Sequence, residues 1–374
     1  MTELYIGLMS GTSLDGSDGV LVDFTTTAPG ALRVLAHAHR PFTPALTHAL
    51  LTLNEPGDNE LHRAAMAGNA LARSYAEVVA ALLAQSCISP GQVVAIGAHG
   101  QTVRHRPREF DGTGYSVQVN NPALLSELCR IDVIADLRSR DIAAGGQGAP
   151  LAPAFHRAVF GRAGEMVAVL NVGGISNLTS LHADGSTFGF DCGPGNALMD
   201  HWCSLHTGQQ FDDGGRWAAS GRVVESLLAS MLTDPYFSLQ APKSTGRDLF
   251  NPAWLKANLA RCHQPLMAPE DVQATLTELT AAVCTADLRR HAASACQVIV
   301  CGGGALNAEL MRRISMKLPD IAIASSAEVG LGIDQVEACA FAWLARAFMQ
   351  GEPGNLPSVT GAAGPRVLGA RYPR

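Results

Sequence analysis

The chain alternates short apolar runs with stretches at helical spacing. Residues 6–22 consist of two apolar runs on either side of a turn rich in Gly, Ser, Thr and Asp, and residues 166–181 repeat that plan half a chain later. Both segments predict hairpins. Apolar residues recur every three to four positions over 61–84, which predicts a helix, and VVAIGAHG after it predicts a strand. This order of elements predicts an α/β domain after each hairpin.

The rest of the chain continues this alternation. Helical patterns cover 122–130, 221–233, 269–293 and 334–349, and 297–318 predicts a buried strand, a triple-glycine turn and an amphipathic helix. In the last of the four helices, Asp334 and Glu337 are spaced like an N-cap residue and its N3 partner.

Residues 143–153, AAGGQGAPLAP, interrupt the pattern, because three glycines and two prolines cannot sustain a helix or a central strand. We interpret the segment as a joint between domains, either a plain linker or a backbone loop lining an interdomain cleft. The predicted domains are 1–142 together with 350–374, and 143–349.

Composition narrows the classes of partner. The 374 residues are 47% hydrophobic and 16% charged with a net charge of -6, so no basic field exists to hold nucleic acid or an anionic membrane. The first arginine is Arg33, and no run of about 18 uncharged apolar residues occurs, which predicts a soluble cytoplasmic protein. The nine cysteines are odd in number and scattered, which favours reduced thiols over structural zinc.

The turn after the first apolar run suits an anion, and phosphate fits best. Backbone N–H groups and hydroxyls are closely spaced there, and Gly11 and Gly16 let the backbone approach a bulky ligand. An ordinary hairpin turn is the alternative. The triple-glycine turn after the strand at 297–301 is a common nucleotide-contacting device, although neither G-x-G-x-x-G nor a P-loop sequence is present.

Several polar side chains are candidates for chemistry. Asp191 follows the strand-like FGF and precedes Gly-Pro-Gly, where a carboxylate serves as a general base or a metal ligand, or only caps the turn. The segment 99–105, HGQTVRH, suits sugar hydroxyls, although lone histidines are more often structural. Arg138 and Arg140 are suited to bind a carboxylate of a ligand, although ion pairing with the neighbouring aspartates is the default interpretation. The segment 242–250, PKSTGRDLF, either touches a phosphate or forms a polar loop.

Together these segments resemble the anhydro-N-acetylmuramic acid kinases, which belong to the actin, hexokinase and Hsp70 superfamily of two-domain ATPases. The resemblance covers nearly the whole chain. It rests on GLMSGTSLDGSD, IGAHGQTVRH, ADLRSRDIAAGGQGAPL, LNVGGISNLT, FDCGPGNALMD, PKSTGRDLFN, CGGGALN, EACAFAWLA and NLPSVTGA. The family pattern usually has Thr at the position of Cys192, which questions a local hydrogen bond but not the neighbouring carboxylate.

The resemblance implies two RNase H-like domains flanking an interdomain active-site cleft, with ATP and Mg²⁺ bound there. It implies a set of residues that bind ATP phosphates or the adenosine side: Gly11, Thr12, Ser13, Leu14, Asp15, Gly16, Ser17, Asp18, Asn171, Gly173, Gly174, Gly302, Gly303 and Gly304. Asp15 and Asp18 are the candidates for holding Mg²⁺, directly or through water, while a solvent-facing carboxylate remains the alternative for Asp18.

The implied reaction opens the 1,6-anhydro bridge of 1,6-anhydro-N-acetylmuramic acid with water and phosphorylates the freed O6, with Asp191 as the catalytic base. Because this amino sugar carries a carboxylate and an N-acetyl group, we select as substrate-binding candidates His99, Gln101, Thr102, Arg138 and Glu337. A capping role for Glu337 is the alternative. The resemblance also suggests a homodimer. Two competing functions are a kinase of the same fold acting on another sugar, and a nucleotide-switched binding protein like actin or Hsp70.

Overall fold

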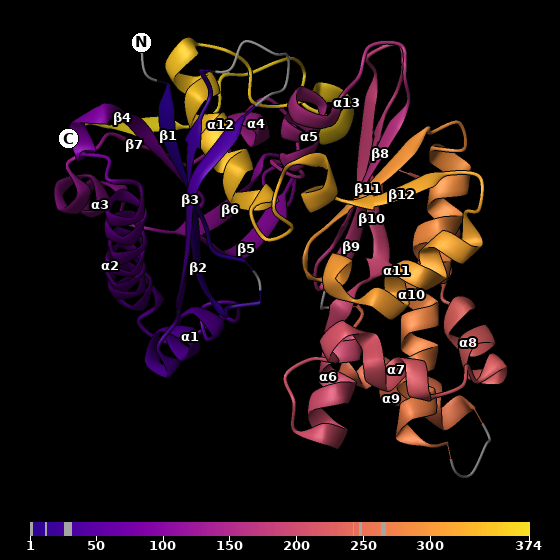
Figure 1. Cartoon of the computed structure of the whole chain (residues 1–374). Helices are drawn as coiled ribbons and strands as arrows, with labels where there is room; N and C mark the ends of the chain where they lie inside the picture. The colour runs from indigo at the N-terminus through magenta and orange to yellow at the C-terminus, as the bar shows by residue number, and fades with distance from the viewer. Residues whose placement is uncertain (1–2, 12, 26–31, 242, 247–248, 263–266) are drawn as a thin grey trace. The chain divides into compact units, whose positions relative to one another are not determined.

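The computed structural model describes residues 3–11, 13–25, 32–241, 243–246, 249–262 and 267–374 (Figure 1). By contacts, the chain divides into two compact units, one of residues 1–159 with 335–374 and one of residues 160–334. Each unit contains helices and one mixed β-sheet, so the predicted α/β class is confirmed. No described helix combines the length and the apolar composition that a membrane crossing requires.

The sheet of the first unit has the strand order β13-β7-β4-β1-β2-β3. The strands β1, β2 and β3 form an antiparallel meander, β4 and β7 run parallel to β1, and β13 closes the edge antiparallel to β7. The bounds of these strands are β1 Leu4–Met9, β2 Gly16–Asp23, β3 Arg33–Pro41, β4 Val93–Ala98, β7 Val133–Ala135 and β13 Ala370–Tyr372. The first predicted hairpin is therefore β1–β2.

The long helix α2 (Glu60–Ser86) covers one face of this sheet. Its buried side chains Leu71, Tyr75, Val78 and Leu82 recur at helical spacing and join the core formed with β1, β2 and β4. The pattern predicted this helix within a few residues at each end.

The helix α12 (Val336–Gln350) packs so closely on β1 and β4 that the strands need glycine. A Cβ atom on Gly7 would lie 1.8 Å from the carbonyl oxygen of Ala338, and one on Gly97 would lie 2.0 Å from that of Phe341. Backbone meets backbone at these two points, which makes α12 part of the first unit.

The remaining elements of the first unit surround the sheet. Residues 101–119 form a separate two-stranded ribbon. The bounds are β5 Gln101–Pro107, β6 Gly114–Val119, α1 Pro44–Leu51, α3 Pro122–Cys129, α4 Ser139–Ala143, α5 Ala152–Phe160, α13 Pro357–Thr360 and the 3₁₀ turn η1 Pro90–Gln92.

The second unit repeats the strand plan of the first. Its sheet has the order β10-β9-β8-β11-β12, with an antiparallel meander of β8, β9 and β10 and with β11 and β12 parallel to β8. The bounds are β8 Val167–Val172, β9 Ile175–Leu181, β10 Thr187–Pro194, β11 Gln297–Cys301 and β12 Ala322–Ser325. Apart from the edge strand β13, the two sheets share one order and the same directions, which agrees with the pair of related domains that the family resemblance implied.

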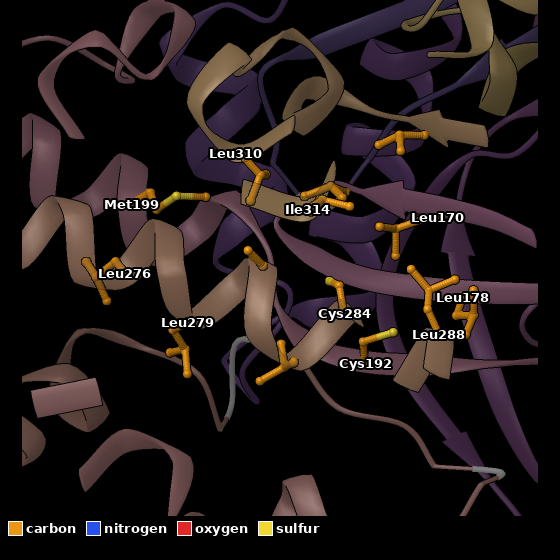
Figure 2. Packing of buried hydrophobic residues seen from close by; sticks show 14 of the residues in the cluster. Leu170, Leu178, Cys192, Met199, Leu276, Leu279, Cys284, Leu288, Leu310 and Ile314 are labelled. Carbon is orange, nitrogen blue, oxygen red and sulfur yellow. The ribbon is translucent and has the colours of Figure 1, made fainter. Parts of the chain in front are cut away.

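Helices of the second unit pack on this sheet around the buried α10 (Pro269–His291). Figure 2 shows Leu276, Leu279 and Leu288 of α10 in one apolar core with Leu170 and Leu178 of the sheet. The other helices and 3₁₀ turns are α6 Asn196–Thr207, η2 Asp213–Gly215, α7 Arg216–Ser220, α8 Glu225–Leu232, η3 Pro235–Ser238, α9 Pro252–Arg261, η4 Gly303–Leu306, α11 Ala308–Lys317 and η5 Ser326–Val329.

Three details differ from the sequence-based predictions. By contacts, residues 143–159 and 335–349 group with the first unit, because Ala154 of α5 packs on Leu356 and Val359 and because α12 lies on β1. The helix α12 begins at Val336, so its N-cap residue is Gln335, without a side-chain cap, and not the predicted Asp334. Glu337 is instead the second residue of the helix.

Candidate active site

The turn of the first hairpin is open where a ligand would approach. Leu14 has a φ of 58°, and its N–H donates to the Gly11 carbonyl at 3.2 Å, which tightens the turn. The Ser13 hydroxyl donates to Oδ1 of Asp15 at 2.7 Å. Among the described residues, a Cβ on Gly11 would meet nothing nearer than Ser13 Oγ at 3.5 Å, so these residues leave room there. Thr12 lies outside the described residues.

His99 connects the end of β4 to this hairpin. Its Nε2 lies 2.8 Å from a terminal nitrogen of Arg138, and its Nδ1 lies 3.3 Å from the carbonyl oxygen of Ser10. Because a guanidinium has only donors, Nε2 must accept and Nδ1–H must donate. Burial and then the charge of Arg138 lower the pKa of His99 to about 3, so the ring is neutral and orients groups without exchanging protons near neutral pH.

Arg138 is held from two sides within the first unit. One terminal nitrogen donates to the Gly148 carbonyl at 2.8 Å and the other faces His99, whereas the buried Nε has no hydrogen-bond partner among the described residues. Burial lowers the pKa of Arg138 to about 10, while the charges of Glu337 and Asp141 act in the opposite direction. The guanidinium therefore stays charged and keeps one N–H for another group.

The other predicted substrate residues lie around this pair. Gln101 is buried, and its Oε1 accepts the Ser10 hydroxyl. Thr102 lies on β5, where its hydroxyl accepts from Gln118 at 3.2 Å. The structure therefore joins His99, Gln101 and Arg138 into one cluster with Ser10. No described hydrogen bond joins Thr102 to this cluster through its side chain.

The two predicted magnesium ligands have different surroundings. Asp15 is exposed in the turn, which fits an ion held mainly by phosphates, water and one carboxylate. Asp18 points toward β3, where its Oδ1 lies 2.8 Å from Nδ1 of His39 and 3.7 Å from Nε2 of His37. Its neighbour Ser17 lies on the opposite face, 3.0 Å from Ser74 of α2. Within the described ranges, no three His, Cys, Asp or Glu side chains form a ready-made metal site.

In the second unit, Asp191 belongs to a row of polar residues across the sheet. It lies opposite Asn177 of β9, which in turn lies opposite Asn171 of β8. Residues directly opposite one another in a sheet share a face. The adjacent row, Phe190, Leu178 and Leu170, belongs to the apolar core, so the polar row occupies the other face.

The Asp191 carboxylate is held by the segment that follows η3. Its Oδ2 accepts from the Ser244 hydroxyl and from the Thr245 N–H, each at 3.0 Å, and the backbone N–H of Asp191 donates to the Lys243 carbonyl at 3.0 Å. Burial raises the pKa of Asp191, although these hydrogen bonds and the charge of Lys243 act in the opposite direction. Asp191 lies inside β10 next to a bulge and not at a strand end, because the strand continues to Pro194.

Lys243 performs a role that the sequence did not indicate. Its ammonium pairs with Asp287 of α10 and lies 5.1 Å from the centre of the Tyr236 ring. The Tyr236 hydroxyl donates to the Asp191 carbonyl at 2.7 Å. An aspartate within the helical pattern of α10 was the available signal, because a charge on a buried helix face needs a partner.

Cys192, the position that departs from the family pattern, faces the apolar core. Figure 2 shows it near Cys284 of α10 among apolar side chains. The neighbouring Cys284 thiol and burial raise the pKa of Cys192, so it remains a neutral thiol beside the catalytic candidate.

The hairpin turn at 173–174 is fixed by the start of α6. The Gly173 carbonyl accepts from the Asn196 N–H at 2.8 Å, and the Gly174 carbonyl accepts from the N–H groups of Gly195 and Ala197. With its carbonyls turned to α6, the turn has its N–H groups to offer to an anion.

The triple-glycine turn lies beside Asn171. Gly302 has a φ of 74°, and a Cβ there would lie 2.4 Å from Oδ1 of Asn171. Glycine is therefore required by both the backbone conformation and the neighbour. A Cβ on Gly303 would approach Asn196 at 3.4 Å, and one on Gly304 would meet Val172 at 2.4 Å.

Two units of one strand plan, each with a small-residue hairpin turn, and a carboxylate held on the second sheet are the features of an α/β phosphotransferase. The family model for anhydro-N-acetylmuramic acid kinase matches residues 3–374. The chain belongs to the anhydro-N-acetylmuramic acid kinase family, and it is a kinase.

Curated relatives agree along the full length. The chain is 64% identical to the anhydro-N-acetylmuramic acid kinase of Variovorax paradoxus (strain S110), covering 99% of each chain. It is 58% identical to that of Cupriavidus pinatubonensis, covering 99% of this chain and 98% of the relative. Among solved structures, it is similar to a ROK family glucokinase from Streptomyces griseus in complex with glucose and AMPPNP, with 13% identity, a TM-score of 0.40 and coverage of 92% and 99%.

Proposed function

We propose that the chain uses ATP and water to convert 1,6-anhydro-N-acetylmuramic acid into N-acetylmuramic acid 6-phosphate, as a step of cell-wall recycling and amino-sugar catabolism. The family membership supports the substrate. The observation that supports the chemistry is the Asp191 carboxylate, which is oriented through Oδ2 by Ser244 and Thr245. No hydrogen bond among the described residues occupies Oδ1, which is the oxygen we assign to accept a proton.

In the proposed reaction, Asp191 accepts a proton from water as the water oxygen bonds to C1. The bond between C1 and O6 breaks, and O6 forms a bond to the γ-phosphorus of ATP while the bond to the β,γ-bridging oxygen breaks and ADP leaves. A positioned base supplies about 10²–10⁴-fold. The remaining acceleration comes from alignment of the two substrates and from charge stabilisation at the phosphates.

The proposed ATP contacts come from three turns. We assign the ATP phosphates to Gly11–Asp18 and to Asn171, Gly173 and Gly174, and the adenosine side to Gly302–Gly304. A Mg²⁺ ion would neutralise charge on the phosphate oxygens when bound. Asp15 suits it better than Asp18, because the carboxylate of Asp18 already contacts His39 and His37.

The sugar contacts belong to the cluster of the first unit. Arg138 offers its charge to the sugar carboxylate, while His99 and Gln101 shape the pocket. Thr102 and Glu337 complete the proposed substrate set. We further propose that the protein acts in the cytoplasm as a homodimer, without nucleic-acid or membrane partners.

Isotope labelling tests this function against a kinase that acts on an ordinary sugar hydroxyl. The reaction is run in ¹⁸O-labelled water, quenched early, and analysed by mass spectrometry, with unlabelled product incubated in the same water as the control for exchange at C1. We expect one ¹⁸O at C1 and none in the phosphate. ATP turnover without label at C1 would contradict the hydrolytic step, and ATP turnover that ignores the sugar would favour a nucleotide-switched binding protein.

A further inference from the structure

Asp141 is a fully buried carboxylate outside the sites assigned above. Its exposure is 0%, and its two oxygens accept from three neutral donors. Oδ2 accepts from the Gly148 N–H at 2.7 Å, while Oδ1 accepts from Asn355 Nδ2 at 2.6 Å and from the Thr360 hydroxyl at 2.7 Å. A buried carboxylate costs free energy unless such donors are present, so this arrangement calls for an explanation.

The donors belong to two sequence motifs that no function has yet explained. Gly148 ends the glycine-rich loop, and Asn355 and Thr360 belong to NLPSVTGA near the C-terminus. These segments also bond through their backbones, from Gln147 N–H to the Thr360 carbonyl and from Ala363 N–H to the Ala144 carbonyl, each at 2.8 Å. The stretch with the composition of a linker is therefore a fixed loop of the first unit.

Gly148 connects Asp141 to Arg138 through its two backbone hydrogen bonds. Its N–H donates to Asp141, and its carbonyl accepts from Arg138 at 2.8 Å. The opposite side of the Arg138 guanidinium meets His99, which in turn donates to the Ser10 carbonyl. A continuous series of hydrogen bonds thus runs from Thr360 through Asp141 and Gly148 to the candidate sugar-binding cluster.

We propose that Asp141 is a positioning residue that aligns Arg138 for an anionic group of the substrate, and that Asn355 and Thr360 act through it. This role rests on the proposed function in so far as Arg138 binds the sugar carboxylate. Glycine at position 146 is part of the same arrangement, because a Cβ there would lie 2.1 Å from Oδ2 of Asp141.

Asp132 provides a matched control. It is also a buried aspartate, and it also holds the C-terminal segment, through Arg371 Nε at 2.7 Å and the Arg374 N–H at 3.0 Å. Its described hydrogen bonds do not reach the loop that contains Gly148. If Asp141 only held the C-terminal segment in place, its replacement, like that of Asp132, would change stability without a specific effect on the sugar KM.

The kinetic test compares Asp141→Asn, Thr360→Val, Thr360→Ser and Asp132→Asn. In Asp141→Asn, the NH₂ group of the new amide faces one of the donors that Asp141 accepts from, so one hydrogen bond is lost. We expect the KM for the anhydro sugar to rise about tenfold, which is the effect of losing one hydrogen bond to a charged group. The KM for ATP should stay the same, because the β1–β2 ladder holds the hairpin independently. In Thr360→Val the KM for the sugar should rise less, and in Thr360→Ser, which keeps the hydroxyl, it should stay close to the wild-type value. Asp132→Asn should lower only the melting temperature.

A spectroscopic test does not depend on activity. In ¹⁵N-imidazole NMR spectra, with His99→Gln used to assign the signal, wild type should show His99 as the neutral Nδ1–H tautomer and Asp141→Asn should shift that signal. An unchanged sugar KM with an unchanged His99 signal in Asp141→Asn would overturn the proposal, as would equal sugar-KM effects in Asp132→Asn. If wild type does not turn over the sugar, the proposed function fails, and the NMR comparison still decides the role of Asp141. Should Asp141→Asn not fold, the two Thr360 variants decide it by the same two measurements.

Discussion

The ammonium of Lys243 lies 3.0 Å from Oδ2 of Asp287, and both side chains are almost excluded from water, with exposed fractions of 3% and 4%. The pair connects α10 to the segment whose next two residues, Ser244 and Thr245, hold the Asp191 carboxylate. An ion pair at this depth fixes one geometry, since either charge alone would be strongly disfavoured.

Removing one partner of this pair should therefore destabilise the protein more than removing both. We expect Asp287→Asn to lower the free energy of unfolding by about 3–5 kcal/mol because it leaves the Lys243 charge buried without its partner. The double variant Lys243→Met, Asp287→Leu should recover most of that loss. Urea unfolding measures both values, and equal losses in the single and double variants would contradict this account.

Asp191→Asn should separate chemistry from binding. The amide keeps the shape but cannot accept the proton, so kcat should fall by about 10²-fold or more while ATP affinity is retained. Steady-state kinetics and nucleotide titration measure the two quantities. Asp184→Asn, in the exposed turn between β9 and β10, is the control and should behave like wild type. Near-normal turnover in Asp191→Asn would remove this residue from the chemistry.

Gly11→Val should weaken ATP binding without destabilising the fold. Because a Cβ at position 11 meets no atom of the described residues nearer than 3.5 Å, we expect the added side chain to crowd the space assigned to phosphate. Isothermal titration with ATP and a thermal melt test the two parts. Gly91→Val is the matched control, because a Cβ there would meet none of the described atoms within 4 Å. Wild-type ATP affinity in Gly11→Val would refute the assignment of this turn to phosphate.

Stability should fall on mild acidification because of buried neutral histidines. Burial lowers the pKa of His156 to about 3, and burial with the charge of Arg138 does the same for His99. Between pH 6.5 and 3 the unfolded chain binds a proton at each site that the native state does not bind, so the free energy of unfolding rises with pH in this window. At pH 5 each histidine costs about 2 kcal/mol relative to pH 7.5.

Urea unfolding at a series of pH values checks this prediction. His156→Gln should reduce the slope of stability against pH between 6 and 4.5, by about one proton's worth. A slope identical to that of wild type would show that His156 is protonated in the native state.

Much of the fold could be predicted from periodicity. The helix α2 followed from its apolar spacing, because it buries one continuous face, and the strand β11 followed from its apolar run, because both of its faces are buried. That α12 belongs to the first unit could not be predicted in this way. Its place on β1 depends on Gly7 and Gly97, which are more than 230 residues away and reveal nothing in the sequence about the helix they admit.

The candidate site was predictable to a similar degree. Turn chemistry and the family resemblance indicated Asp191, His99 and Arg138 as candidates. The residues that orient them were missed, because Lys243 and Asp141 resemble ordinary charges of polar loops in the sequence. Their roles depend on partners 44 and 219 residues away, Asp287 and Thr360, which only the folded chain brings within hydrogen-bonding distance.

The shared strand order of the two sheets has a consequence for the history of the chain. The hairpins β1–β2 and β8–β9 hold the same place in their sheets, and the strands β4 and β11 follow as the same parallel neighbour in each. Their sequences have diverged so far that one turn is rich in hydroxyls and the other in glycine and asparagine. The topology thus shows a twofold internal repeat that the amino-acid sequence does not show. Such a repeat is expected if an ancestral domain was duplicated and each copy then specialised.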